Sequence, residues 1–211
     1  MAETAREEIL KRVRAAVGTG SGAGWDAIER TYRQSSEMGR EGLLHLLEDR
    51  LRDYDAGVYR SDAADLRSVI AGVLASRGKR RMAIANGFPK DWLPTDGEFV
   101  EDAAGGYARL DGCDGVLTTA TLAIAETGTI VLQDAPGQGR RALTLVPDYH
   151  LCVVEAGSVV QTVPEAFARL QGTARKATTF FSGPSATADI EMTRIKGVHG
   201  PRFVDVVFVM D

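Results

Sequence analysis

The chain has very little cysteine, and its two cysteines lie far apart. Cys113 and Cys152 are the only thiols among 211 residues. They form no CxxC pair, and an iron–sulfur cluster usually needs four thiolate ligands. The sequence therefore excludes an iron–sulfur cluster held by this chain alone and also a disulfide framework. We expect two buried, unpaired cysteines, and the sequence identifies no cofactor.

Long apolar runs and a strong excess of one charge are lacking too. No segment approaches the length of a membrane span, and the first residues lack the apolar core of a signal peptide. The chain has 25 basic and 29 acidic residues and no basic stripe with interleaved aromatics, which argues against a nucleic-acid partner. We expect a cytoplasmic protein without a membrane span. Its 44% hydrophobic residues are enough for a real core.

Familiar catalytic motifs are also missing. No GxGxxG follows a predicted strand, and GxxxxGK[ST], HExxH and GxSxG do not occur. These motifs mark dinucleotide sites, phosphate-binding loops, zinc proteases and serine hydrolases. The sequence predicts no metal site, and any site must be found from less specific signals.

Helical periodicity characterises the N-terminal part of the chain. Residues Thr4–Val17 carry one apolar stripe, and the sequence GTGSGAG at 18–24 is typical of a flexible linker. Further helices are expected near Trp25 and over Arg40–Tyr54, where leucines form an apolar face. We therefore expect residues 1–55 to be a helical N-terminal region.

From residue 56 onward, short apolar segments alternate with helical ones. Segments rich in β-branched residues are typical of buried strands, and alternation with helices favours a parallel sheet. Strands are expected at 58–59, 81–85, 115–120, 129–132, 151–154 and 202–210, and helices at 62–77 and 163–171. The predicted fold class is α/β, with a mostly parallel sheet flanked by helices over residues 56–211.

A segment of small, hydroxyl and acidic residues lies between two Gly-Pro turns and suits ligand contact. The turn at 182–185 can expose backbone N–H groups. Ser185 or Thr187 can begin a helix with Asp189 and Glu191 in or near its first turn. Such a helix start can hold an anion.

Titratable side chains supply further candidates. His199 lies between glycines that leave room for a ligand, whereas His150, just before a strand, is either a proton carrier or a structural histidine. Of the pair Arg140 and Arg141, at least one is expected to be an ordinary surface residue, and the other can clamp a carboxylate or phosphate. Glu126 lies among small apolar residues, where it either acts on a ligand or only hydrogen-bonds neighbouring amides.

Four segments in the second half of the chain carry a family resemblance. They are AETGTIVL at 125–132, LVPDYHLCVV at 145–154, SGPSATADIE at 182–191 and GVHGP at 197–201. In this order they resemble the lactate utilization protein C family, also called the LUD-domain or YkgG (LutC) family. The resemblance implies a fold similar to the NagB/RpiA/CoA transferase-like group. It also implies a role in oxidising L-lactate to pyruvate together with iron–sulfur partner subunits, with this chain as the component without a cluster.

The resemblance also suggests which positions share a pocket. The matching positions are Glu126, Thr127, Gly128, Thr129, Pro147, His150, Ser182, Gly183, Ser185, Thr187, Asp189, Glu191, His199 and Gly200. Arg141 is added to this set as a cation for a small carboxylate or phosphate ligand. Glu126 and His199 are the candidates for catalysis.

Three hypotheses follow for the function. The first is a subunit of a lactate-oxidising complex that binds a small anion. The second is a stand-alone transferase or isomerase with Glu126 as nucleophile or base. The third is a scaffold whose N-terminal helices bind partners through their leucine faces. The site itself depends on one spatial prediction, which is that Glu126, Ser185 and His199 converge in a polar cleft at strand edges.

Overall fold

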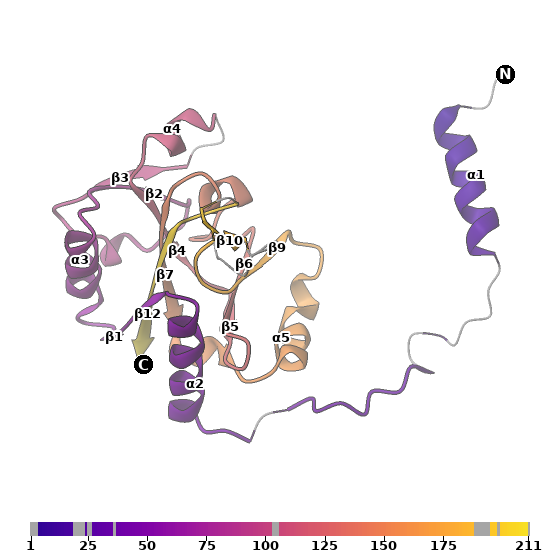
Figure 1. The fold of residues 1–211 in the computed structure, drawn as a ribbon, viewed down its shortest axis with the longest axis horizontal. Coiled ribbons are helices and arrows are strands. Elements are labelled where there is room, and N and C mark those ends of the chain that lie inside the picture. Colours follow the sequence, from indigo (N-terminus) through magenta and orange to yellow (C-terminus); the bar gives the residue numbers. More distant parts are fainter. Residues whose placement is uncertain are drawn as a thin grey trace. The chain divides into compact units, whose positions relative to one another are not determined.

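The computed structural model describes residues 4–18, 24, 27–35, 37–102, 106–187, 195–197 and 199–210 (Figure 1). The chain divides into two compact units, Met1–Arg33 and Gln34–Asp211. The sequence placed the boundary near residue 55 instead. The difference arises because the helix that follows Gly39 packs into the second unit, as described below.

The first unit contains the predicted amphipathic helix, α1 (Ala5–Val17). Thr4 caps it: its hydroxyl accepts from the Glu7 amide, and the Glu7 carboxylate accepts from the Thr4 amide. The apolar stripe of α1 is exposed at Ile9, Val13 and Val17. Residues 19–23 of the expected linker, and Trp25 with Asp26, lie outside the described residues; no helix forms over residues 28–35.

The second unit is built on a six-stranded, wholly parallel sheet, which confirms the predicted fold class. In sheet order the strands are β1 (Gly57–Asp62), β12 (Phe203–Met210), β7 (Tyr149–Glu155), β4 (Gly115–Thr119), β2 (Arg81–Ile84) and β3 (Glu98–Glu101). The central strands are buried on both faces, which explains why they read as almost continuous apolar runs.

One face of this sheet is covered by α3 (Leu66–Ser76). Its buried Leu66, Ile70 and Val73 recur at helical spacing and pack with Leu151 and Val153 of β7. The helix predicted over 62–77 is therefore confirmed, with narrower bounds. Short helical segments complete the connections: η2 (Lys90–Trp92), α4 (Ala108–Asp111), η3 (Arg141–Thr144), η4 (Ala156–Ser158) and η5 (Gln171–Thr173).

The opposite face of the parallel sheet packs against α2 (Arg40–Asp53) and a second sheet that the sequence did not predict. This four-stranded sheet has the order β8 (Val159–Val160), β5 (Leu122–Ile124), β6 (Thr129–Gln133) and β9 (Thr178–Phe181). β5, β6 and β9 pair antiparallel, so the strand predicted at 129–132 exists but belongs to this smaller sheet. The helix predicted over 163–171 is confirmed as α5 (Val163–Leu170), which begins with a capping box between Thr162 and Glu165.

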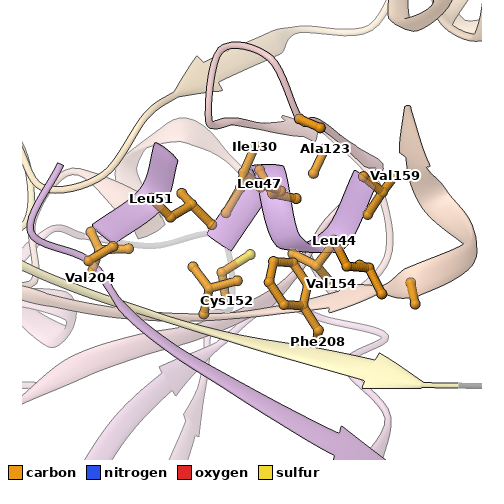
Figure 2. Close-up of a cluster of buried hydrophobic side chains, with 14 of the residues drawn as sticks. Leu44, Leu47, Leu51, Ala123, Ile130, Cys152, Val154, Val159, Val204 and Phe208 are labelled. Carbon is orange, nitrogen blue, oxygen red and sulfur yellow. The ribbon is translucent and has the colours of Figure 1, made fainter. Parts of the chain in front are cut away.

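The leucine face of α2 forms the centre of this core (Figure 2). Leu44, Leu47 and Leu51 are 0% exposed and lie against Cys152 of the parallel sheet and Ile130 of the small sheet. The prediction that this face binds a partner is therefore wrong, because it is already buried inside the second unit. Only the face of α1 remains open to that use.

Candidate functional site

A pocket of about 250 Å³ opens at the amino-terminal ends of β7 and β12, beside the end of β9. Five segments line it. They are η3 (Arg141, Thr144), the two strand starts (His150, Val204), the end of β9 with the turn after it (Phe181, Ser182, Gly183, Pro184, Ser185) and the loop before β12 (His199, Pro201). The sequence-predicted candidates in this lining are Arg141, His150, Ser182, Gly183, Ser185 and His199.

His150 is the most deeply buried titratable group of the pocket. Its side chain is 2% exposed, and its ring lies 5.1 Å from the Phe181 ring, centroid to centroid. Strand register explains its partner: Thr118 of β4 pairs with Cys152, two residues along β7 on the same face as His150. The Thr118 hydroxyl lies 2.8 Å from Nε2 of His150. Burial first, and the Arg141 charge second, lower the pKa of His150 to about 3, so the imidazole is neutral at neutral pH.

The second ring nitrogen of His150 faces the pocket. Nδ1 has no hydrogen-bond partner among the described residues, whereas every fully buried side-chain nitrogen or oxygen there has one. Nδ1 therefore keeps access to the pocket that His150 lines. A nearly buried nitrogen without a protein partner is a position where a ligand makes a hydrogen bond.

Arg141 provides positive charge in the same pocket. Its Nη1 donates to the Thr144 hydroxyl over 2.9 Å, which fixes the guanidinium at the pocket wall. Among the described residues it contacts no carboxylate, and partial burial lowers its pKa, although part of the side chain reaches solvent. Its neighbour Arg140 instead forms a bidentate pair with Asp102, at 2.8 and 2.9 Å. Of the two arginines, Arg141 is thus the one available to an anion.

A chain of hydroxyl groups leads from the β5–β6 turn to the pocket. The Thr127 and Thr129 hydroxyls lie 2.7 Å apart, and Thr129 lies 2.9 Å from the Ser182 hydroxyl. Only Ser182 lines the pocket; the other two lie behind it. Gly128 belongs to the same turn, where a side chain would collide with Arg50 of α2 at its positive φ of 61°.

Two loops are tied together around Ser185. Its N–H donates to the Pro201 carbonyl, its carbonyl accepts from the Gly197 N–H, and its hydroxyl accepts from the His199 N–H over 3.1 Å. Gly200 packs closely against Ser185: a Cβ placed on Gly200 would lie 3.4 Å from the Ser185 Cβ. Ser185 and His199 are therefore neighbours in the pocket, as predicted.

The helix predicted to begin at Ser185 is wrong. Residues Ala186–Thr187 form β10, which pairs antiparallel with β11 (Ile195–Lys196). The two residues after Ser185 are therefore in a strand, so no helix begins at Ser185. Asp189 and Glu191, and any helix that begins at Thr187, lie outside the described residues.

Glu126 does not line the pocket. It lies in the β5–β6 turn, where its Oε1 accepts from the Gln161 side chain over 2.9 Å and its backbone carbonyl accepts from Arg50. Pro147 is buried in the loop before β7 and is likewise not part of the lining. The structure thus groups most of the predicted residues around His150 and Arg141, and it separates Glu126 from them.

Several residues at this site gave no signal in the sequence. Thr118, Thr144 and Phe181 contact His150 or Arg141, yet each reads as an ordinary strand or loop residue. Only the strand register brings Thr118 to His150. The register of strands that are buried on both faces cannot be read from a single sequence.

A second polar cluster lies on the other face of the same strands. Asp205 of β12 is 0% exposed and accepts two hydrogen bonds from Arg77, at 2.6 and 2.8 Å, and one from the Tyr149 hydroxyl at 2.9 Å. The bond to Asp205 raises the pKa of Arg77, and burial, followed by Asp205, raises the pKa of Tyr149. A side chain at Gly57 would begin 2.1 Å from an Asp205 oxygen, so glycine is required there.

Two larger hollows lie elsewhere in the described residues. One of about 660 Å³ lies between the end of α3 and the start of β2, and one of about 410 Å³ lies at the carboxyl end of β2. The buried carboxylate of the second hollow, Asp102, is already paired with Arg140. Over the described part of the chain, no cluster of His, Cys, Asp and Glu could hold a metal ion, and no helix has the length and hydropathy needed to cross a membrane.

Comparison with known proteins gives consistent matches along the whole chain. The family model of the LUD domain matches residues 2–209. The chain is 41% identical over 181 residues to "Lactate utilization protein C" from Deinococcus radiodurans, covering 84% of each protein. It is 28% identical over 224 aligned positions to the protein of the same name from Exiguobacterium sp., covering 99% of this chain and 97% of that relative.

A solved structure agrees with the fold. The crystal structure of a DUF162 family protein from Deinococcus radiodurans matches with a TM-score of 0.70 and 36% sequence identity. The match covers 82% of this chain and 99% of that one.

Proposed function

We propose that this chain, which belongs to the LUD domain family, takes part in lactate utilization by binding a small carboxylate in the pocket beside Arg141. Relatives named lactate utilization protein C support the process. The observation that carries the binding is the Arg141 guanidinium, which has no carboxylate contact among the described residues and lies beside a neutral, nearly buried histidine. A volume of about 250 Å³ suits a ligand of a few heavy atoms.

Within this proposal the chain is the component of a cytoplasmic lactate-oxidising system that carries no iron–sulfur cluster. Both cysteines are free and buried, and burial raises the pKa of Cys152 to about 12, so it is a protonated thiol at neutral pH. Electron transfer is assigned to iron–sulfur subunits on other chains. The exposed stripe of α1 is the surface on which we expect such a subunit to bind.

Calorimetric titration of the purified protein with L-lactate tests the binding. Arg141→Met should weaken it by about tenfold to a hundredfold, because a hydrogen-bonded charge pair contributes about 1.5–3 kcal/mol. Arg175→Met, a change at an exposed arginine outside the pocket, is the matched control and should bind as the unaltered protein does. Equal binding by the two variants would remove Arg141 from the site.

Growth tests the process. Cells that lack the protein should fail to grow on lactate and should grow normally on glucose. The unaltered chain and Arg175→Met should restore growth on lactate, whereas Arg141→Met should not. Normal growth of the deletion strain on lactate would contradict the proposed role.

Co-purification tests the partners. The protein isolated from lactate-grown cells should bring iron–sulfur chains with it, detected by their visible absorbance and by mass spectrometry. A variant without residues 1–24 should lose these chains and keep the unfolding transition of the second unit. Retention of the partners by that variant would leave α1 without this function.

The stand-alone enzyme remains a second candidate. Its proposed nucleophile or base, Glu126, is held by Gln161 in a turn and does not line the pocket, so its position gives this alternative less support. Turnover of acyl-CoA or sugar phosphates by the isolated chain, abolished in Glu126→Gln, would establish it.

A further inference from the structure

The side-chain amide of Gln138 is nearly buried, and its two ends have different surroundings. The residue is 6% exposed. Its Oε1 accepts from the Gln133 backbone N–H over 2.7 Å and from the Thr121 hydroxyl over 2.9 Å. Because a backbone N–H can only donate, the Gln133 contact fixes this end of the amide as the oxygen. The amide nitrogen, Nε2, therefore lies at the other end.

Nε2 of Gln138 has no hydrogen-bond partner among the described residues. Every fully buried side-chain nitrogen or oxygen of those residues has a partner, so Nε2 is not fully buried. Gln138 lines a hollow of about 110 Å³, and Nε2 is reached from there. A nearly buried amide with two N–H groups and no protein acceptor is stable when water or a ligand accepts from it.

This hollow lies next to the pocket that contains His150. Arg141 and Thr144 of η3 line both of them. β9 also contributes to both, with Thr179 in the lining of the hollow and Phe181 in the lining of the pocket. Side chains two residues apart along a strand point to the same face and lie about 7 Å apart. The two cavities therefore follow one another along β9, and Arg141 belongs to both.

The other polar groups of the hollow favour a ligand that accepts hydrogen bonds. Among the described residues Arg141 donates only from Nη1, to Thr144, so its other N–H groups are available. Thr179 adds a hydroxyl. Two more charged residues complete the lining: Arg140 is already paired with a carboxylate, and Asp134 is exposed, so solvent screens its charge.

We infer that this hollow is a phosphate subsite, in which Nε2 of Gln138 and the Arg141 guanidinium donate to the oxygens of a phosphate group. A phosphate group has at least three acceptor oxygens that point in different directions, so it can take donors from two side chains at once. A volume of about 110 Å³ is several times what one water molecule needs and suits one such group. The subsite goes beyond the carboxylate pocket, although the two share Arg141 and Thr144.

Calorimetric titration with inorganic phosphate, at an ionic strength held constant with sodium chloride, tests the subsite. Gln138→Glu keeps an acceptor for Gln133 and Thr121 and replaces the amide nitrogen by a carboxylate oxygen. Phosphate affinity should fall at least about tenfold, because two donors are lost and a like charge faces the anion. Gln171→Glu, the same change at an exposed glutamine outside both cavities, is the matched control and should not alter phosphate affinity. Equal phosphate affinities in the two variants would overturn the inference.

A spectroscopic measurement needs no variant and covers the case in which Gln138→Glu does not fold. In protein labelled with ¹⁵N-glutamine, the side-chain N–H signals of Gln138 should shift as inorganic phosphate is added, because the anion accepts from both N–H groups. The signals of Gln171 should stay unchanged, since this residue lines neither cavity. Unshifted Gln138 signals at the highest phosphate concentration would mean that only water occupies the hollow, and would overturn the inference.

Two further titrations identify the source of the phosphate group. 3-Phosphoglycerate joins a phosphate to a carboxylate through a short carbon chain, and glycerate has the carboxylate alone. Tighter binding of 3-phosphoglycerate than of inorganic phosphate and of glycerate would assign the subsite to a ligand that spans both cavities. Binding no tighter than that of inorganic phosphate would assign it to the free anion. In both cases Gln138→Glu should weaken the binding, and an unchanged affinity in this variant would overturn the inference.

The same protein distinguishes a failure of this inference from a failure of the proposed function. Binding of L-lactate without binding of phosphate would overturn the phosphate subsite and leave the carboxylate pocket intact. Binding of phosphate without binding of L-lactate would support the subsite and contradict the proposed carboxylate ligand.

Discussion

Tyr149 and His150 are neighbours in the chain, yet they belong to two polar clusters on opposite faces of the sheet. On one face, Arg77, Tyr149 and Asp205 form a closed cluster, in which the buried carboxylate receives three hydrogen bonds. On the other face, Arg141 and His150 form an open cluster, in which, among the described residues, the cation has no carboxylate contact and Nδ1 has no hydrogen-bond partner.

The difference separates structure from function in this protein. Buried polar groups that satisfy one another need nothing further, and they fix how the strands pack. Buried polar groups that the protein leaves unsatisfied are stable only when water or a ligand reaches them. Burial and charge alone would not have distinguished the two clusters. Asp205, in the closed cluster, is buried even more deeply than His150 in the open one.

Arg77→Met should convert the closed cluster into an open one and have the largest effect. It leaves the fully buried Asp205 carboxylate with only the Tyr149 hydroxyl. We expect a loss of about 3 kcal/mol in the free energy of unfolding, at the low end for a broken buried pair because the Arg77 side chain is 35% exposed. Urea denaturation measures it. Lactate affinity of the folded variant should not change, and a loss below about 1 kcal/mol, as for a surface pair, would show that water already reaches Asp205.

Lowering the pH should have the second-largest effect, and it should act on the open cluster. The pKa of His150 is about 3 in the folded protein and about 6.5 in an unfolded chain, so between these values the unfolded state binds the extra proton. This contribution to stability is complete above pH 6.5 and is lost as the pH falls. We expect a loss of about 2 kcal/mol at pH 5.

His150→Gln is the control for the acid effect, since glutamine does not titrate. Urea denaturation at pH 7.5 and pH 5 should show the loss in the unaltered protein and a smaller loss in the variant. The charged group that acts on this imidazole is Arg141, and the other side chains in contact with it, Thr118 and Phe181, are neutral. The same pH dependence in both proteins would mean that folding does not lower the pKa of His150.

Tyr149→Phe should open the closed cluster only slightly. It removes one of the three hydrogen bonds to Asp205 and keeps the ring in the core. The expected loss in the free energy of unfolding is about 1 kcal/mol, and ligand affinity should be unchanged. A change in lactate affinity would show that the two faces are coupled through the backbone between Tyr149 and His150.

Glu126→Gln should have the smallest effect. The amide oxygen of glutamine can still accept from Gln161, and the residue does not line the pocket. Stability should change by less than about 0.5 kcal/mol, as for a typical surface substitution, and both lactate affinity and growth on lactate should be kept. A loss of growth with intact lactate binding would assign Glu126 a function outside both clusters.

The sequence predicted the elements better than their arrangement. Periodicity identified α1, α2, α3 and α5 and the main strands, because apolar spacing is a local property. It did not show that the leucines of α2 are buried between two sheets, since an apolar face looks the same whether it meets a partner protein or its own sheet. The hairpin β5–β6 and the edge strand β9 were missed as a separate sheet for a related reason: pairing is a long-range property.

The candidate site was predicted in part. Ser182, Ser185 and His199 were found from composition, and Arg141 from its turn. The sequence did not show that Glu126 lies apart from these residues. Its position depends on hydrogen bonds to distant residues such as Gln161, which a single sequence does not reveal. One signal was readable: Asp205 is the only charge within the apolar run 203–210, and a charge in a central strand requires a buried partner.

The place of β12 in the sheet bears on how the protein is made. β1 pairs only with β12 among the described strands, and β12 also borders β7, although it follows both by many residues along the chain. During synthesis, a ribosome delivers β1 and β7 long before the strand that joins them. Until it emerges, β1 has no partner strand and one edge of β7 stays unpaired, and unpaired strand edges are prone to pair with other chains.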